Sequence, residues 1–437
     1  MKHALTLLVG CVPIIVITMM LGSGSRLAGL AVGIFFASLI SFYTPPGTGN
    51  TEDDFWERAL FKLISLMIVL RLLLGFFLLQ SGISTFLAPD SGGYFTGAME
   101  VVGYYRGELQ EFQVNPNAFT HFYTILSASL YYFIDPEPFL PAIINCFLGG
   151  GVVYCVYYQG LELGYSRQKA FWGATLVGLW PSMMLWSCLN IRDAWMHFTL
   201  CLCVLLWTRV LRTKRFTPPV FLCMVVSGVM IYQIRIYILP IMIIAMLVAL
   251  YANRATYKRP ALILMTCLLL VALQMDSYLG FSVLEILQQL QSIRAGFARA
   301  DVGSSFAIGV TYNSLFDVVL FLPTALVYFF FAPFPWTLTS ALQSTTLVEV
   351  LVFYLLFIPI VKGWNRSFRE HFSAAVTPFM LMVFVAVAYS LAEGNVGTLY
   401  RHKAQILPMI LVFAPAGIRG FRLWGQHYLA DEIKRAG

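Results

Sequence analysis

Residues 140–160 read LPAIINCFLGGGVVYCVYYQG, and this run contains no charged side chain. A helix that crosses a bilayer needs about 20 mostly apolar residues, so the run is long enough to span a membrane. Similar runs recur along the 437 residues, of which 59% are hydrophobic and 11% charged, with a mean hydropathy of +0.77. Soluble domains carry about 25% charged residues. The sequence therefore predicts an all-α polytopic membrane protein, with residues 1–437 forming a single integral membrane domain.

Apolar segments of near-membrane length predict a bundle of about 12–13 transmembrane helices. The candidate spans are 4–21, 27–43, 60–80, 119–134, 140–160, 170–187, 194–208, 219–234, 237–251, 261–275, 315–332, 347–361, 374–391 and 404–418. The first could be a cleaved signal peptide. No A-x-A site follows it and a second apolar segment begins almost at once, so an uncleaved first span is preferred.

Basic residues concentrate in five segments, which are 165–169, 209–215, 252–259, 362–371 and the C-terminal tail. Cytoplasmic loops are enriched in Lys and Arg, so all five are predicted to be cytoplasmic. Counting crossings then places a long loop, about 81–139, on the outer side, provided that 119–134 is a juxtamembrane or re-entrant helix. An even number of crossings is also required between the basic segments 252–259 and 362–371, so 315–332 is predicted to be re-entrant. An additional crossing within 281–310 would also give an even number.

The net charge of +7 is spread in short groups between the apolar segments. This distribution is typical of topology signals, and no basic surface interleaved with aromatic residues indicates a nucleic-acid partner. The eight cysteines lie within or beside apolar segments without CxxC spacing, so no disulfide framework is predicted.

Asp90 is the first candidate for chemistry, because it lies in the predicted outer loop within the sequence PDSGGY at 89–94. Its carboxylate could act as a general base or bind a metal. On local sequence alone, a helix cap at Asp90 followed by a glycine turn explains the pattern at least as well.

Arg192 and Asp193 lie between two predicted spans, and Arg235 interrupts a long apolar run. Charges near a membrane interior are costly, so they are functional candidates by default. Asp193 is predicted to be a second outer carboxylate facing Asp90, and Arg192 and Arg235 are predicted to bind a phosphate. The structural alternatives are a self-capped turn at Asp193 and an interfacial arginine at Arg235.

Arg401, His402 and Lys403 form a basic cluster before the last predicted span, on the predicted outer side. A basic cluster on that side opposes the usual charge bias, so these three residues are predicted to hold a phosphate or pyrophosphate. Tyr94 and Tyr400 are predicted to contact the substrate, and interfacial anchoring is the alternative for the whole segment.

Other features receive no functional role. Arg71 lies inside a predicted span and His121 on an apolar segment. The sequon at 365–367 is predicted to be cytoplasmic, and no Walker, GxGxxG, HExxH or GxSxG motif occurs.

Three short motifs resemble those of GT-C glycosyltransferases, the polytopic enzymes that use lipid-phosphate-linked sugars. They are PDSGGY at 89–94, the stretch from LWPS at 179–182 to NIRD at 190–193, and YRHKAQILP at 400–408. The resemblance, which is to protein O-mannosyltransferase-like and aminoarabinose-transferase-like members, implies a GT-C-like bundle with juxtamembrane helices in the outer loop. It also implies that Asp90 is the catalytic carboxylate. More than one predicted span precedes the outer loop, where many members have one, and Asp90 lacks a neighbouring second acid.

The favoured hypothesis is an inverting glycosyltransferase that moves a sugar from a polyprenyl-phosphate donor to a glycan, lipid or protein acceptor. A bacterial inner membrane with the site facing the periplasm is expected from the resemblance. A divalent cation, Mg²⁺ or Mn²⁺, held by Asp90 and Asp193 is left open as a cofactor. The alternatives are a polymerase or ligase of surface polysaccharide that uses lipid-pyrophosphate-linked oligosaccharide, and a flippase or transporter of lipid-linked sugars.

Overall fold

The computed structural model describes residues 26–43, 51–109, 121–253, 283–298, 305–307, 309–338, 344 and 346–418. These residues form helices and no named strand, with one isolated antiparallel bridge between Ser305 and Asn395. The prediction of an all-α protein is confirmed over the described ranges. The predicted spans 4–21 and 261–275 lie outside them.

Five helices are long and apolar enough to cross a membrane, namely α3 (Thr51–Gln80), α7 (Phe139–Glu162), α10 (Asp193–Thr213), α17 (Leu347–Glu370) and α18 (Phe372–Ala392). Shorter apolar helices accompany them, namely α2 (Arg26–Ser41), α11 (Pro218–Ile234), α12 (Ile238–Ala252) and α15 (Leu315–Phe331). The remaining helices are α4 (Ile83–Leu87), α5 (Asp90–Tyr105), α6 (His121–Phe133), α8 (Arg167–Gly178), α9 (Pro181–Ser187), α14 (Val283–Phe297), α19 (Val396–Lys403), α20 (Leu407–Leu411) and α21 (Ala414–Gly417).

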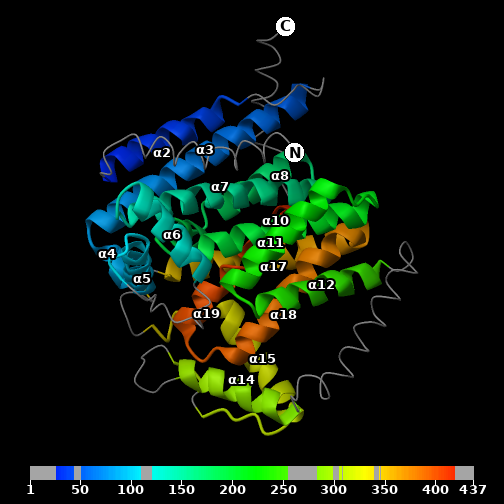
Figure 1. The fold of residues 1–437 in the computed structure, drawn as a ribbon. Helices are drawn as coiled ribbons and strands as arrows, with labels where there is room; N and C mark the ends of the chain where they lie inside the picture. The colour runs from blue at the N-terminus through cyan, green and yellow to red at the C-terminus, as the bar shows by residue number, and fades with distance from the viewer. Residues whose placement is uncertain are drawn as a thin grey trace.

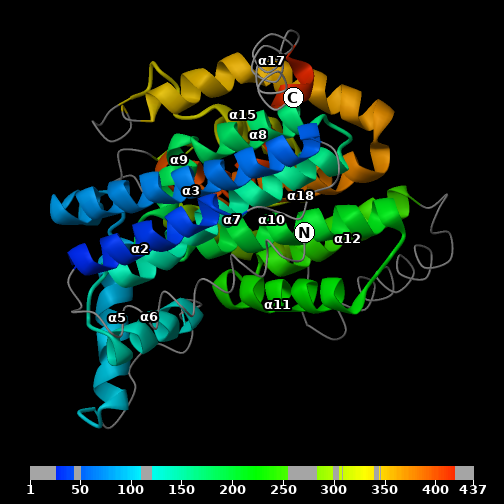
Figure 2. The ribbon, with the colours of Figure 1, turned by 90° about the horizontal axis from the view of Figure 1, so that it is seen from above.

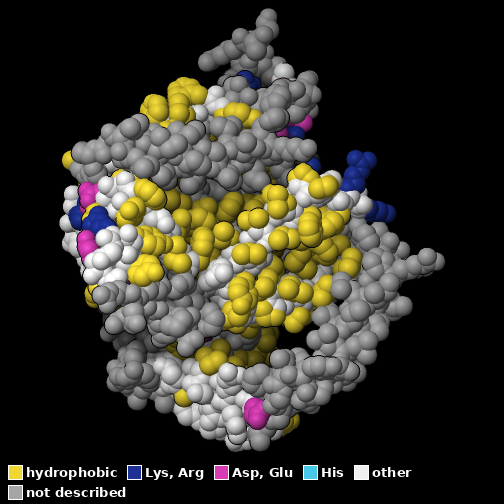
Figure 3. All heavy atoms as spheres, in the orientation of Figure 1, with side chains coloured by type: hydrophobic (Ala, Val, Ile, Leu, Met, Phe, Trp, Pro, Cys, Tyr) yellow, Lys and Arg dark blue, Asp and Glu magenta, His cyan; other side chains and the backbone are white. Residues whose placement is uncertain are grey.

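Helix α7 is almost entirely buried and packs against α3, α8 and α10 (Figure 1). Seen from above, α17 and α11 lie on opposite sides of the layer that contains α7 and α10 (Figure 2). Hydrophobic side chains cover the outer face over α11 and α12, as expected for a surface in contact with lipid (Figure 3).

The two ends of the bundle differ in chemistry. At one end, which we call the basic end, Arg167 pairs with Asp53 and Glu57, and Arg212 pairs with Glu162. The opposite end, which we call the site end, holds the beginning of α10, the α11–α12 turn and the end of α18. Tyr165 is hydrogen-bonded to Ser367, and Asn253 to Ser373, so four of the basic segments that the sequence predicts on one side have described residues at or next to the basic end.

The segment between α3 and α7 stays at the site end. Arg26 contacts both Gln80, where α3 ends, and Glu137, just before α7 begins. Since both ends of the segment meet at Arg26, α6 does not cross the bundle, as the count of crossings requires. Helices α4, α5 and α6 occupy this end in Figure 1.

Helix α15 also has contacts from the site end at both of its ends. Tyr312, just before the helix, donates to the carbonyl of Leu391, and Lys403 donates to the carbonyl of Phe330 near its end. This arrangement agrees with the prediction of a re-entrant segment at 315–332.

Two predicted spans are not continuous helices. The span 170–187 is divided into α8 and α9, and the span 404–418 contains α20 and α21 as separate short helices. Proline explains the breaks: Pro181, Pro408 and Pro415 each stand in the first turn of a new helix. A proline lacks the amide hydrogen needed inside a helix but is well suited to its first turn.

Candidate functional site

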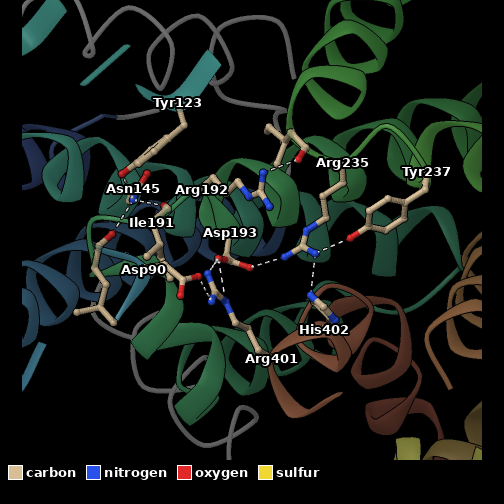
Figure 4. Close-up of polar contacts among 12 residues, drawn as sticks. Asp90, Tyr123, Asn145, Ile191, Arg192, Asp193, Arg235, Tyr237, Arg401 and His402 are labelled. Atoms are coloured by element: carbon tan, nitrogen blue, oxygen red, sulfur yellow. Dashed lines mark hydrogen bonds and ion pairs between the residues drawn. The ribbon is translucent and has the colours of Figure 1, made fainter. Parts of the chain in front are cut away.

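Asp193 lies at the centre of a charged cluster at the site end (Figure 4). It is the first residue of α10, and its side chain is fully buried. Its Oδ2 accepts from Arg401 through Nη2 at 2.5 Å and Nε at 3.1 Å, and its Oδ1 lies 3.4 Å from Nη2 of Arg235. A carboxylate is also favoured there because the N-terminal end of a helix carries partial positive charge.

Arg401 joins this buried carboxylate to Asp90. Its third nitrogen, Nη1, lies 2.5 Å from Oδ2 of Asp90, whose side chain is 48% exposed. The guanidinium also lies over the ring of Trp186, 5.4 Å from the centroid. Burial alone would lower the pKa of Arg401, but the carboxylates of Asp193 and Asp90 outweigh it and hold that pKa above its usual value. One guanidinium thus connects a buried acid to an accessible one.

A buried polar network fixes the turn that leads into α10. Asn145 on α7 donates through Nδ2 to the carbonyls of Leu189 and Ile191 at 2.7 and 2.8 Å. Tyr123 on α6 donates to Oδ1 of Asn190 at 2.9 Å. Asn145 was not predicted as a site residue. It and Gln159 are the carboxamides within residues 140–160, and a buried amide usually has hydrogen-bond partners.

His402 extends the cluster away from Asp193. Its Nε2 lies 2.7 Å from Nη1 of Arg235, and its Nδ1 lies 2.5 Å from Oε1 of Glu393. A neutral ring with its proton on Nδ1 leaves Nε2 as the acceptor for Arg235. Burial and the nearby Arg235 lower the pKa of His402, while Glu393 opposes them. The ring also stacks on Tyr389 with centroids 4.3 Å apart.

Arg235 is held on several sides. Besides His402 and Asp193, it donates to the hydroxyl of Tyr237 at 2.7 Å. Burial lowers its pKa, but the neighbouring tyrosines and Asp193 raise it well above its usual value. Arg235 is only 5% exposed, so in this arrangement it supports Asp193 and His402 rather than presenting itself to solvent.

A second buried cluster surrounds Glu349, in the first turn of α17. Its carboxylate accepts from Tyr400 at 2.6 Å and from both the amide and the hydroxyl of Ser182, at 2.7 and 2.9 Å. Lys403 lies nearby, with Nζ 3.3 Å from the carbonyl of Phe330, and burial lowers its pKa to about 8. Glu349 was not predicted as a site residue, although it is a lone acid in the predicted span 347–361.

The structure therefore brings together Asp90, Asp193, Arg235, Arg401 and His402, and places the other predicted residues around them. Tyr400 and Lys403 belong to the Glu349 cluster. Tyr94 is buried with its ring edge-to-face against Tyr123, and Arg192 donates to the carbonyl of Ile234 at 3.0 Å. Arg71 is buried and donates to Ser187 and to the carbonyl of Gly178, which fits a structural role.

The acids of the cluster do not form a typical cation site. Asp90 and Asp193 both face the guanidinium of Arg401, and no group of three His, Cys, Asp or Glu residues with metal-binding geometry occurs in the described ranges. Divalent cations such as Mg²⁺ prefer several oxygen ligands. The positive charge between these two carboxylates is supplied by Arg401.

The chain matches no family model, no curated protein and no solved structure. A function has to follow from the chemistry of the site, since a fold class alone does not specify one.

Proposed function

We propose that this protein is a membrane glycosyltransferase that moves a sugar from a polyprenyl-phosphate donor to an acceptor hydroxyl at the site end of the bundle. The observation that carries the proposal is the Asp90–Arg401–Asp193 arrangement. It combines an accessible carboxylate with an arginine that is anchored on its far side by a buried acid. A base and a phosphate ligand are the two groups that this reaction needs.

The anchoring of Arg401 suggests how the groups would work. Nε and Nη2 are engaged by Asp193, while Nη1 points to the half-exposed Asp90. A donor phosphate that reaches Nη1 would replace Asp90 as its partner. Asp90 would then be free to accept the proton of the acceptor hydroxyl while the acceptor oxygen attacks the anomeric carbon. The bond to the phosphate oxygen breaks, and Arg401 stabilises the negative charge of the departing phosphate.

An apolar cavity of about 440 Å³ supports a donor with a long lipid chain. It lies between α8, α9 and α17, and its lining includes Trp172, Trp180, Val352 and Leu356. Its wall also includes Glu349, which accepts a hydrogen bond from Tyr400, the residue before Arg401. A polyprenyl chain in this cavity would leave its phosphate near the charged cluster.

Mass spectrometry of lipid-linked and surface glycans tests the proposal in cells that produce Asp90→Asn. We expect the variant to accumulate a polyprenyl-phosphate sugar and to lose one sugar from a glycan. Glu100→Gln is the matched control, because Glu100 is an exposed acid on the same helix. Normal glycans in Asp90→Asn at equal protein levels would refute a role for Asp90 as the base.

A second variant and a transport assay separate the competing functions. A polymerase or ligase that acts on lipid-pyrophosphate oligosaccharides predicts that Arg401→Met abolishes activity while Asp90→Asn does not. Transport of a lipid-linked sugar across reconstituted vesicles, without any new covalent product, would instead indicate a flippase.

A further inference from the structure

A second cavity, of about 160 Å³, is lined by Ser91 and Gly92, the two residues that follow Asp90. It is enclosed by the end of α3, by α4, by the first turn of α5, by the start of α7 and by the turn after α9. Its apolar lining includes Gly75, Leu79, Phe139, Ala142 and Leu189. Polar lining residues are Ser84, Thr85, Ser91 and Asn190, and Ser91 directly follows Asp90.

Gly92 lines this cavity, and nothing in its own surroundings requires a glycine. It lies within α5, and a Cβ added to it would meet no heavy atom within 4 Å. Glycine in a helix is less favourable than alanine, because its backbone loses more conformational freedom on folding. Gly75, on the opposite wall, differs because its Cβ would lie 2.5 Å from the carbonyl oxygen of Cys188. A larger side chain at Gly92 would extend into open space at the cavity that Gly92 lines.

The cavity lies next to surfaces suited to lipid. Helix α4, which contributes Ser84 and Thr85 to the lining, exposes Ile83 and Phe86. Phe77, near the end of α3, is also exposed. Exposed apolar side chains at the end of a membrane bundle favour contact with the bilayer, so a lipid could reach the cavity from the side.

We propose that this cavity binds the acceptor, and that the acceptor is a membrane lipid whose hydroxyl group reaches Asp90. This inference rests on the proposed function. An apolar cavity of about 150 Å³ holds a molecule the size of benzene, so the space fits roughly five or six carbons next to the hydroxyl. A sugar ring in the apolar part would leave its hydroxyl groups buried without hydrogen-bond partners, which is unfavourable.

The two cavities have different neighbours. The larger one includes Trp180 and Pro181, before and at the start of α9, whereas the smaller one includes Cys188 and Leu189, just after that helix. Only the smaller cavity is lined by the residue next to Asp90.

In the transfer, the lipid hydroxyl loses its proton to Asp90 and its oxygen bonds to the anomeric carbon. The bond between that carbon and the donor phosphate oxygen breaks, and the phosphate retains the electron pair.

The test compares Gly92→Leu with Gly93→Leu. Both positions have open space around an added Cβ, but only Gly92 lines the cavity. Glycans are measured by mass spectrometry separately in the solvent-extractable lipid fraction and the protein fraction of cells with equal amounts of each variant. We expect Gly92→Leu to reduce one glycosylated lipid at least tenfold, and Gly93→Leu to stay within twofold of the parent protein.

A binding measurement gives a readout that does not depend on turnover. A photoactivatable farnesol analogue, added to the purified protein in phosphatidylcholine nanodiscs, is expected to label peptides containing Leu79 or Leu189. Gly92→Leu should reduce this labelling at least fivefold, and Gly93→Leu should not. Labelling unchanged in Gly92→Leu, or confined to the larger cavity around Trp180, would overturn the assignment of the cavity.

The outcomes also separate this inference from the proposed function. If Asp90→Asn accumulates the polyprenyl-phosphate donor, removes a sugar from the protein fraction and leaves every other glycosylated lipid unchanged, the lipid acceptor is wrong and the glycosyltransferase stands. If Asp90→Asn leaves both fractions unchanged, the proposed function and the acceptor assignment fail together.

Discussion

The contrast between Asp193 and Asp90 gives the sharpest test of the charged cluster. Both carboxylates contact Arg401, each at 2.5 Å, but the side chain of Asp193 is 0% exposed and that of Asp90 is 48% exposed. The same change from Asp to Asn therefore removes a buried charge in one case and a solvated charge in the other.

The expected effects on stability follow from burial. Removing one partner of a buried ion pair costs about 3–5 kcal/mol, and Asp193→Asn leaves Arg235 without the carboxylate it faces. An exposed ion pair contributes about 0–1 kcal/mol, so Asp90→Asn should change stability little. At about 2 °C per kcal/mol, the lower end of the range for larger domains, the melting midpoint should fall by about 6–10 °C for Asp193→Asn and by less than about 2 °C for Asp90→Asn.

The assay is thermal unfolding of the purified variants in one detergent at pH 7, followed by tryptophan fluorescence and by the loss of the monodisperse peak on gel filtration. Midpoints are compared, rather than free energies of unfolding, because a large helical bundle need not unfold in a single step. Equal shifts for the two variants, or a larger shift for Asp90→Asn, would refute the assignment of Asp193 as the buried anchor of Arg401.

Three further predictions concern His402, Gly363 and Arg71. The pKa of His402 is lowered in the folded protein, so below about pH 6.5 the unfolded chain binds a proton that the folded protein does not. Stability should therefore fall as the pH falls, and the drop in melting midpoint from pH 7 to 5.5 should be smaller in His402→Gln than in the parent protein. Gly363→Ala should destabilise the protein by about 1–3 kcal/mol in thermal unfolding, because the added Cβ would overlap the carbonyl oxygen of Phe413. Gly296→Ala, whose added Cβ meets no heavy atom within 4 Å, should be neutral or stabilising. Arg71→Leu should lower the midpoint by an amount equivalent to about 1–3 kcal/mol, because the carbonyl of Gly178 loses its buried donor, and an unchanged midpoint would show that this contact is dispensable.

The sequence alone determined the class of the fold and the grouping of the charges. A bilayer acts on local composition, since about 20 consecutive apolar residues suffice to span it, and α3, α7, α10, α17 and α18 all fall on predicted spans. Counting crossings from the basic segments also placed the segments that hold Asp90, Asp193 and Arg401 at one end, because each spanning helix carries the chain to the opposite side of the bundle.

Which charges contact one another depends on how the distant helices pack. Arg401 bridges Asp90 and Asp193, which are 311 and 208 residues away in the sequence, and no local pattern encodes such a pairing. The breaks in the spans 170–187 and 404–418 likewise became visible only in three dimensions. Pro181 and Pro408 could each have kinked a continuous helix, but in the structure a new helix begins at each of these prolines. Ser182, in the first turn of α9, thereby donates a hydrogen bond to Glu349. Side chains buried at such contacts are fixed by the packing of distant helices, and packing is a property of the whole chain.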